Sequence, residues 1–175
     1  MTTNESDERG VGGPGSRPKR SEAFQELIPG NKCFGCGPDN PHGLRIKSRW
    51  EGDEAFCRFQ PSAHHCAGPP DVLNGGIIGT LIDCHSVCTA IADAYRTDRR
   101  AIGSGPPIWF VTAALRITYL APTGIDHPVD LWARIHDREK KKTIVHTRLL
   151  SEGVECARGE VVAVRVSGEW THGRR

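Results

Sequence analysis

The sequence predicts an α+β domain in which a long antiparallel sheet wraps around one central helix. The predicted helix follows an Asn-Gly-Gly turn within residues 69–96 and runs about six turns without glycine or proline after Gly79. Two strand-like segments precede it and four follow it, joined by short connections. Because a helix stripe and one face of an antiparallel sheet can bury each other, this order favours a sheet curled around the helix.

The predicted helix has two faces of different chemistry. Apolar residues recur at spacings of three, four and seven and form one stripe, made of Ile77, Leu81, Cys88, Ile91 and Tyr95. At about 100° per residue, a second face is small and polar, with Gly76, Gly79, Asp83, Ser86, Ala90, Asp93 and Thr97. We expect the first face to be buried and the second to be open to the close approach of another molecule.

Strands are expected wherever apolar and polar residues alternate between turn signals. Residues 44–49 and 55–60 form a predicted hairpin with its turn at Gly52 and Asp53. The four later strands are expected at residues 109–120, 129–137, 143–151 and 155–166. A short helix over residues 21–27, with Ser21 as its cap, is expected ahead of the sheet.

The chain has the length of one domain, with 175 residues. Residues 1–20 are rich in Gly, Pro, Ser and charged residues, so they cannot offset the entropy lost on ordering. We therefore expect a disordered tail over residues 1–20 and one domain over residues 21–170. The tail has acidic residues and no apolar stretch, so we do not expect a signal peptide.

Composition argues against several kinds of partner and compartment. Lys and Arg number 23 against 21 for Asp and Glu, and this near-neutral balance argues against general nucleic-acid binding. No apolar run approaches the ~20 residues that cross a bilayer, so no membrane association is expected. The seven cysteines are an odd number in a chain without a secretory signal, which favours a reduced cytoplasm over a disulfide framework.

A motif at the start of the helix gives the most specific information. The run P-x-V-L-N-G-G-x-x-x-T-L-x-D, residues 70–83, resembles the motif of PaaI-like thioesterases of the hotdog-fold superfamily, in which H/N-G-G precedes a helical Asp or Glu. The resemblance extends to CFGCGPDNPHGLRIK at residues 33–47 and to LRITYLAPT at residues 115–123. It covers about residues 33–167 and implies a hotdog fold.

The resemblance also implies catalytic roles for four residues. The Gly75 N–H would polarise the thioester carbonyl, Asp83 would act as base or nucleophile, and Thr112 would orient the attacking water. Asn74 stands where many members have His, and it can donate a hydrogen bond but cannot titrate.

The residues themselves support part of this assignment. Gly75 and Gly76 leave backbone N–H groups uncovered at the positive end of a helix dipole, where a carbonyl oxygen or oxyanion is stabilised. Asp83 is an isolated carboxylate in a nearly uncharged segment, which requires hydrogen bonds or a function. A second interpretation of Asp83, as a loop cap or a solvent-facing residue, stays open.

Substrate-binding residues are expected in two places. His65 lies in a loop next to the helix start, where a substrate would pass, although a solvated loop histidine fits equally well. Arg138, Lys140, Lys141 and Lys142 belong to the basic turn at residues 134–148, whose local charge of +4 suits the phosphates of coenzyme A. A solvated, charged hairpin tip is the alternative interpretation.

The cysteines raise the question of a metal or a cysteine nucleophile. Cys33 and Cys36 form a C-x-x-C pair, half of a zinc site that His64, His65 or Cys66 would complete. A second well-spaced pair is missing, and Cys-Phe-Gly-Cys-Gly also resembles a turn of the thioesterase relatives, so no metal and no cofactor are expected. Cys84 and His85 are adjacent on a helix and point in different directions, which argues against a catalytic dyad.

The leading functional hypothesis is hydrolysis of acyl-CoA thioesters to a free acid and coenzyme A. One alternative is a hotdog enoyl-CoA hydratase, in which Asp83 would work with His65 or His85, and another is a non-catalytic acyl-CoA-binding module. The long strands carry no obvious edge protection, which predicts a homodimer or homotetramer. By the resemblance, active sites lie between subunits, with Gly75 of one facing Asp83 of the other.

Overall fold

The structure is a computed structural model that describes residues 22–28 and 30–167. The predicted disordered tail, the expected helix cap Ser21 and residues 168–170 at the predicted domain end lie outside these described residues. Ahead of the sheet, a short 3₁₀ helix, η1, spans Phe24–Leu27 where a short helix was expected.

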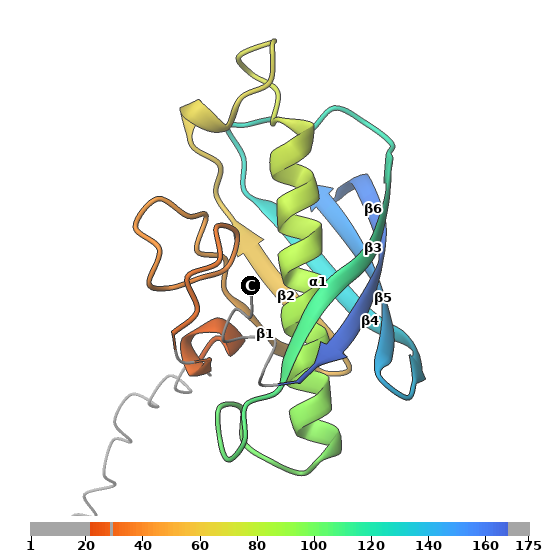
Figure 1. The fold of residues 1–175 in the computed structure, drawn as a ribbon. Coiled ribbons are helices and arrows are strands. Elements are labelled where there is room, and N and C mark those ends of the chain that lie inside the picture. Colours follow the sequence, from red (N-terminus) through yellow and green to blue (C-terminus); the bar gives the residue numbers. More distant parts are fainter. Residues whose placement is uncertain (1–21, 29, 168–175) are drawn as a thin grey trace, which may run out of the picture.

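One antiparallel sheet and one long helix, α1 (Gly75–Thr97), form the domain (Figure 1). The six strands lie in the order β1-β2-β4-β5-β6-β3. Their bounds are Ser48–Glu51 for β1, Glu54–Phe59 for β2, Trp109–Tyr119 for β3, Val129–Glu139 for β4, Lys142–Ser151 for β5 and Val154–Val166 for β6. The order places β1 and β3 at the two edges, and the predicted α+β architecture is confirmed.

The first strand is shorter than the sequence predicted. β1 begins at Ser48 instead of residue 44, because Arg45 has a φ of 49° and cannot continue an extended strand. The N–H groups of Leu44 and Ile46 donate to the carbonyls of Phe34 and Gly35 at 2.8 and 3.2 Å. Residues 44–46 therefore pair with the Cys-Phe-Gly-Cys loop and hold it against the domain.

The sheet packs tightly on α1, and the core lies between them. The apolar stripe is buried from Leu81 onward, as predicted, whereas Ile77 stays partly exposed. A Cβ on Gly159 of β6 would lie 2.4 Å from Cγ2 of Ile82, so only glycine permits this approach of sheet to helix. The helix is therefore held at a fixed distance and rotation against β6.

The expectation of an open small-residue face was wrong for the stretch of α1 from Ser86 to Asp93. Ser86, Ala90 and Asp93 are buried. Ser86 Oγ lies 2.7 Å from Thr147 Oγ1 on β5, because the curled sheet uses the small side chains as its closest contact with the helix. The face is open at its N-terminal end, where Gly76 is exposed and Gly79 and Asp83 are partly exposed, and at Thr97 at its C-terminal end.

α1 is also the one helix among the described residues that is long and apolar enough to span a bilayer by length and composition. From the sequence, no apolar run of about 20 residues was expected. Most of the segment is buried inside the domain, as in the core helix of a globular fold, so it is weak evidence for a membrane span.

A chain of hydrogen bonds ties η1, β1, α1 and β2 together inside the core. Gln25 Nε2 donates to Ser48 Oγ at 2.8 Å, and Ser48 Oγ lies 2.8 Å from His85 Nδ1. His85 Nε2 is 3.1 Å from the Ala55 carbonyl, which can only accept, so Nε2 carries the proton and Nδ1 accepts from Ser48. Burial lowers the pKa of His85 to about 4, which keeps the imidazole neutral in this chain.

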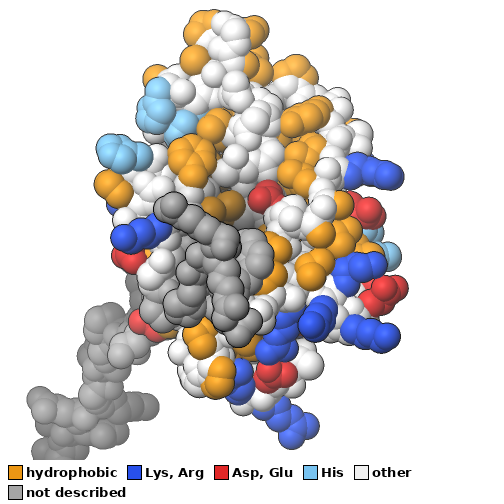
Figure 2. All heavy atoms as spheres, viewed as in Figure 1, with side chains coloured by type: hydrophobic (Ala, Val, Ile, Leu, Met, Phe, Trp, Pro, Cys, Tyr) orange, Lys and Arg blue, Asp and Glu red, His pale blue; other side chains and the backbone are white. Residues whose placement is uncertain are grey.

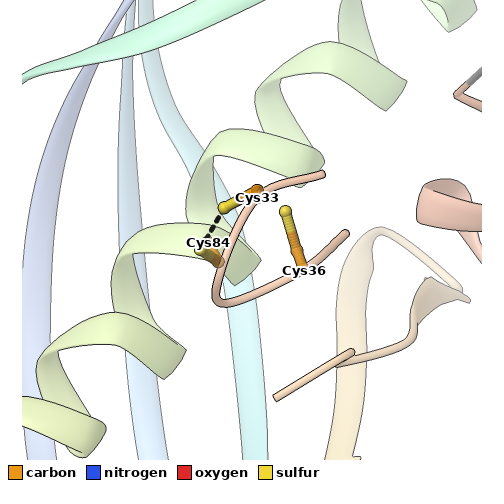
Figure 3. Close-up of side chains that lie close together, drawn as sticks. All are labelled: Cys33, Cys36 and Cys84. Carbon is orange, nitrogen blue, oxygen red and sulfur yellow. Dashed lines mark hydrogen bonds between the residues drawn. The ribbon is translucent and has the colours of Figure 1, made fainter. Parts of the chain in front are cut away.

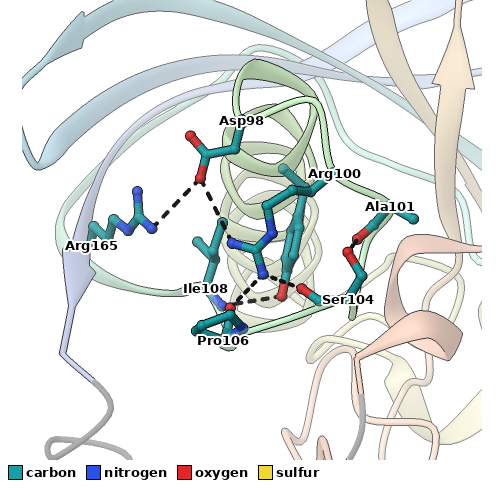
Figure 4. A network of polar contacts seen from close by, with 8 residues as sticks. Asp98, Arg100, Ala101, Ser104, Pro106, Ile108 and Arg165 are labelled. Carbon is teal, nitrogen blue, oxygen red and sulfur yellow. Dashed lines mark hydrogen bonds and ion pairs between the residues drawn. The ribbon is translucent and has the colours of Figure 1, made fainter.

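A second polar network fixes the connection between α1 and β3 (Figure 4). Arg100 donates to the carbonyls of Ser104 and Pro106, and its guanidinium lies over the Tyr95 ring, 4.9 Å from the centroid. The Tyr95 hydroxyl accepts a hydrogen bond from the Ile108 N–H at 3.2 Å, just before β3 begins. These contacts set where β3 starts relative to the helix end.

Ser48→Ala should destabilise the domain by about 1–3 kcal/mol, because Gln25 Nε2 and His85 Nδ1 would then be buried without a partner. The measurement is urea denaturation followed by circular dichroism. Ser62→Ala, at an exposed loop serine, is the matched control and should change stability by less than about 0.5 kcal/mol. Equal stability of the two variants would contradict the bonding pattern assigned to His85.

Candidate active site

The N-terminus of α1 is capped by Asn74. Its Oδ1 accepts from the N–H of Gly76 at 2.7 Å and of Ile77 at 3.4 Å, and its carbonyl accepts from Ile78 N at 3.0 Å. The Asn74 side chain thus caps the helix through Oδ1, while its Nδ2 can still donate a hydrogen bond, so its predicted catalytic role stays a prediction. Gly76 was predicted to bind substrate through its N–H, which is engaged by this cap.

The N–H of Gly75 is left available. Within residues 22–28 and 30–167, no acceptor is hydrogen-bonded to it. The Tyr119 hydroxyl of β3 donates to the Gly75 carbonyl at 2.8 Å and holds this first turn in place. An unengaged backbone donor at the positive end of a 23-residue helix can stabilise a carbonyl oxygen or an oxyanion.

A hollow of about 370 Å³ opens beside this donor. Gly75, Ile78 and Tyr119 line it together with Thr123, whose buried hydroxyl has no hydrogen-bond partner among the described residues. A buried polar group without a partner is unfavourable unless a ligand or water satisfies it. The helix N-terminus therefore borders a hollow whose lining includes the Gly75 backbone and Thr123.

Asp83 lies on the partly open side of α1 and is held by β3. Thr112 Oγ1 donates to Asp83 Oδ1 at 2.5 Å. Burial raises the pKa of Asp83, the hydrogen bond from Thr112 lowers it, and negative charge at Cys36 raises it. The sequence-predicted pair of Asp83 and Thr112 is thus brought together as a positioned carboxylate of increased basicity.

A bulge in β3 allows that strand to contact both ends of the site. Thr112 touches Asp83, whereas Ile117 packs 3.4 Å from the Cβ position of Gly79 and Tyr119 reaches Gly75. Thr112 and Ile117 are an odd number of residues apart, so a regular strand would direct them to opposite faces. The irregular pairing between Thr112 and Ala114 shifts the alternation of side chains by one residue, so that Thr112 and Ile117 both face the helix.

Gly75 and Asp83 do not meet within one chain. They are eight residues apart on one helix, which corresponds to about 12 Å along its axis. A general base and the donor that polarises the same carbonyl must both lie within about 3 Å of the reacting group or its water. If the two groups act on the same carbonyl, as predicted, one copy of the chain holds two half sites.

His65 is close to the helix start but is partly used in its own turn. Its Nδ1 accepts from Ser62 N at 3.0 Å, and its carbonyl accepts from Asn74 N at 2.9 Å. Burial and the neighbouring His64 lower the pKa of His65, so the neutral ring carries its proton on Nε2. The prediction that His65 binds substrate stays a prediction, with Nε2–H as the available donor.

The basic residues of the β4–β5 turn lie at the other end of α1. Arg138 binds the carboxylate of the buried Asp93 through two hydrogen bonds of 2.7 and 2.9 Å. The structure thus gives Arg138 a partner inside the chain. Lys140, Lys141 and Lys142 are exposed at the tip, with Lys142 Nζ 3.4 Å from Glu139 Oε2, and their predicted contact with substrate stays a prediction.

The C-x-x-C pair has a different partner from those predicted. Cys33 and Cys36 meet Cys84 of α1 (Figure 3), and the three Sγ atoms lie within 4.8 Å of one another. The alternative considered from the sequence, completion by His64, His65 or Cys66, does not match this cluster, because the loop folds back onto the helix. Cys84 is 51 residues from Cys33, and no local spacing signals such a contact.

Similarity to known proteins is found among solved structures. No family model matches the chain, and no curated protein matches it. A thioesterase superfamily protein from Shewanella loihica is 38% identical with a TM-score of 0.58, and the similarity covers 73% of this chain and 96% of that one. The chain belongs to the thioesterase superfamily.

Two further structures of this superfamily type share the hotdog fold at lower identity. PaaI of E. coli, from the phenylacetic acid degradation operon, is 16% identical with a TM-score of 0.56 over 71% of this chain and 82% of that one. Thioesterase superfamily member 2 of Mus musculus is 18% identical with a TM-score of 0.54 over 71% and 84%. Their likeness concerns the fold alone, and it confirms the predicted hotdog fold.

Asn74→Ala should destabilise the domain of this thioesterase superfamily member by about 1 kcal/mol, because two N–H groups lose their acceptor. Asn74→Asp keeps the accepting oxygen at the positive end of the helix dipole, so its stability should equal or exceed that of the unmodified chain. Thermal unfolding of the two variants tests this. A stability loss of the same size in both would contradict the capping role.

Proposed function

We propose that the protein hydrolyses acyl-CoA thioesters to a free acid and coenzyme A. The observation that supports it best is the placement on one helix of two complementary groups: the unengaged Gly75 N–H and the Asp83 carboxylate held by Thr112. A thioester needs one donor for its carbonyl oxygen and one base for water, and its thiolate leaves without a strong acid.

In the proposed reaction the carbonyl oxygen of the thioester accepts a hydrogen bond from Gly75 N–H. Asp83 takes a proton from water as the water oxygen attacks the carbonyl carbon, and Thr112 keeps the carboxylate aligned. The helix N-terminus stabilises the negative charge of the tetrahedral intermediate. Breaking the C–S bond then releases the acid and the thiolate of coenzyme A. Direct attack by the carboxylate is a second route to the same products.

The two half sites are joined in our proposal by a homodimer paired along β3. This strand pairs with β6 only, so its outer edge carries no partner strand among the described residues. The edge also exposes the hydrophobic side chains of Leu115 and Tyr119, 41% and 53% accessible, on a face with several hydrophobic side chains (Figure 2). An exposed long edge of this kind favours pairing with a second copy.

Antiparallel pairing about the middle of β3 would complete the site. Along this strand Thr112 marks the position of Asp83, and Tyr119 marks the position of Gly75. With a two-fold axis midway between residues 112 and 119, residue 112 of one strand lies opposite residue 119 of the partner strand. Gly75 of one subunit would then face Asp83 of its partner, and each dimer would hold two sites. A tetramer would be formed by association of two such dimers.

The two alternative functions have less support in the site. Hydration of an enoyl thioester needs a histidine next to the carboxylate. His85 is buried, and both of its ring nitrogens are engaged in the hydrogen-bond chain that runs from Gln25 to Ala55. That leaves His65 as the candidate. For a non-catalytic binding module, the bond between Thr112 and Asp83 would have no function. A panel of acyl-CoAs separates hydrolysis from binding alone. Hydrolysis releases free thiol, whereas a binding module gives saturable binding with a zero rate of thiol release.

We also propose that the three exposed lysines 140–142 bind the phosphates of coenzyme A, since they concentrate positive charge beside a surface hollow of about 560 Å³. The cytoplasm remains our proposed compartment, and all seven cysteines are free thiols.

Asp83→Asn should lower kcat for acyl-CoA hydrolysis by about 10²-fold or more, because the side chain keeps its shape but loses the charge that activates water. Thr112→Ala should lower it by about tenfold, since one aligning hydrogen bond is lost. Thiol release by folded protein is the measurement, with thermal unfolding as the control for folding. Near-normal turnover by Asp83→Asn would refute the proposed mechanism.

Gly75→Pro should remove the polarising donor while preserving the helix. Proline is favoured at the first helical position, and Asn74 has φ −62° and ψ 133°, the extended conformation that a following proline prefers. We expect kcat to fall by about 10²-fold or more. Gly75→Ala keeps the N–H, and its Cβ would make an ordinary 3.4 Å contact with the Tyr119 hydroxyl, so it is the matched control.

Mixing the Gly75→Pro and Asp83→Asn proteins tests the shared site. After unfolding and refolding together, half of the dimers are hybrids with one intact and one doubly altered site, so activity should recover to about a quarter of the unmodified level. Each variant refolded alone should stay inactive. A mixture that stays inactive, although hybrids form, would show that both groups act within one chain.

A further inference from the structure

Four cysteines from two distant segments gather beside α1. Cys33 and Cys36 come from the loop before β1, and Cys84 and Cys88 are one turn apart on the same side of the helix. The Sγ atoms of Cys33 and Cys84 are 3.6 Å apart, and those of Cys33, Cys36 and Cys84 all lie within 4.8 Å of one another. Cys88 is buried in the core, with 2% of its surface exposed.

We propose that Cys33, Cys36, Cys84 and Cys88 bind one structural Zn²⁺ ion. This site lies outside the proposed catalytic groups and does not depend on the proposed function. Binding exchanges the four thiol protons for one Zn²⁺, and the four protons pass to solvent. The product is a four-thiolate complex, which is the commonest closed arrangement for zinc in a structural role.

The spacing of the sulfur atoms fits this ion. A tetrahedral zinc centre with Zn–S bonds of about 2.3 Å places its sulfur atoms about 3.8 Å apart. The 3.6 Å between Cys33 and Cys84 is close to that edge. Thiols are weak hydrogen-bond donors and acceptors, so their mutual attraction gives little reason to collect several of them in one place. A soft metal ion supplies that reason.

The loop is shaped to bring its thiols to the helix. A Cβ on Gly35, between the two cysteines, would lie 2.3 Å from Cys84 Sγ, so the backbone touches the helix thiol directly. Gly37 N donates to the Cys33 carbonyl at 2.9 Å and closes a tight turn around the pair. This turn therefore directs Cys33 and Cys36 to one point on α1.

A buried amide supports the sulfur atoms from behind. Asn31 is 5% exposed, and its Nδ2 donates to Cys36 Sγ at 3.5 Å. Its Oδ1 accepts from Cys33 N at 3.1 Å, which fixes the amide orientation with its donor toward the sulfur. An amide N–H that donates to a ligand sulfur orients that ligand and stabilises a thiolate over a thiol.

The structural consequence of the ion would be to join the loop before β1 to the middle of α1. Cys84 is next to Asp83 in sequence, on the helix that carries the carboxylate. Zinc would therefore stabilise the wall of the half site that carries the carboxylate, without reaching the substrate. The gain would appear as stability of the whole domain, because the ligands close a loop of about 50 residues between Cys36 and Cys84.

The first test is the metal content of the full chain, purified without chelator. Mass spectrometry of the metals should give about one zinc per chain. After exchange, Co²⁺ should show thiolate charge-transfer bands and the visible bands of a tetrahedral site. Iron in place of zinc would overturn the assignment of the ion. Protein without metal that gives no cobalt spectrum while its thiols are reduced would overturn the site.

Variants assign the ligands. Cys33→Ser and Cys84→Ser should each lose zinc and the cobalt bands, whereas Cys66→Ser, a partly exposed cysteine outside the cluster, should keep both. A strong chelator should lower the melting temperature of the unmodified chain and of Cys66→Ser alike. Full zinc content in Cys33→Ser and Cys84→Ser would overturn the proposal. It would also be overturned if the unmodified protein is isolated without metal, with Cys33 and Cys84 joined by a disulfide, and still binds no zinc once that disulfide is reduced.

Discussion

The structure depends on the close contact between α1 and the sheet. Gly159 lets β6 approach Ile82, and the buried pair of Ser86 and Thr147 fixes the rotation of the helix at the same level. Because a helix is a rigid rod, fixing its middle also fixes the direction of its first turn and of Asp83. The positions of the Gly75 donor and of the carboxylate thus depend on this packing as well as on the bonds from Tyr119 and Thr112.

Polar groups on this helix fall into two sets according to whether the protein satisfies them. His85 and Asp93 are buried and have their partners inside the chain, at Ser48, Ala55 and Arg138. The Gly75 N–H and part of the Asp83 carboxylate are left for other molecules. Whether the chain satisfies a polar group therefore distinguishes these residues more sharply than residue type does, since the histidine is fully engaged and the glycine N–H is not.

The sequence predicted the fold and most element boundaries because alternation along a strand and periodicity along a helix are local properties. It also placed Asp83 beside Thr112, through the family motif. It failed where the answer depends on contacts between distant segments. Periodicity shows that α1 has two faces but not that the sheet covers both, and no local pattern links Cys33 to Cys84. The capping role of Asn74 follows from the rotamer of its side chain, which the motif leaves open.

The bulge in β3 divides that strand into two parts with separate tasks. Before it, Thr112 serves the carboxylate, and beyond it Leu115, Ile117 and Tyr119 follow the opposite phase beside the start of α1. Side chains in the second part can therefore change in size without moving the first, because the irregular pairing absorbs the shift between them. The strand can therefore accept different side chains beside the start of α1 without changing the geometry at the carboxylate.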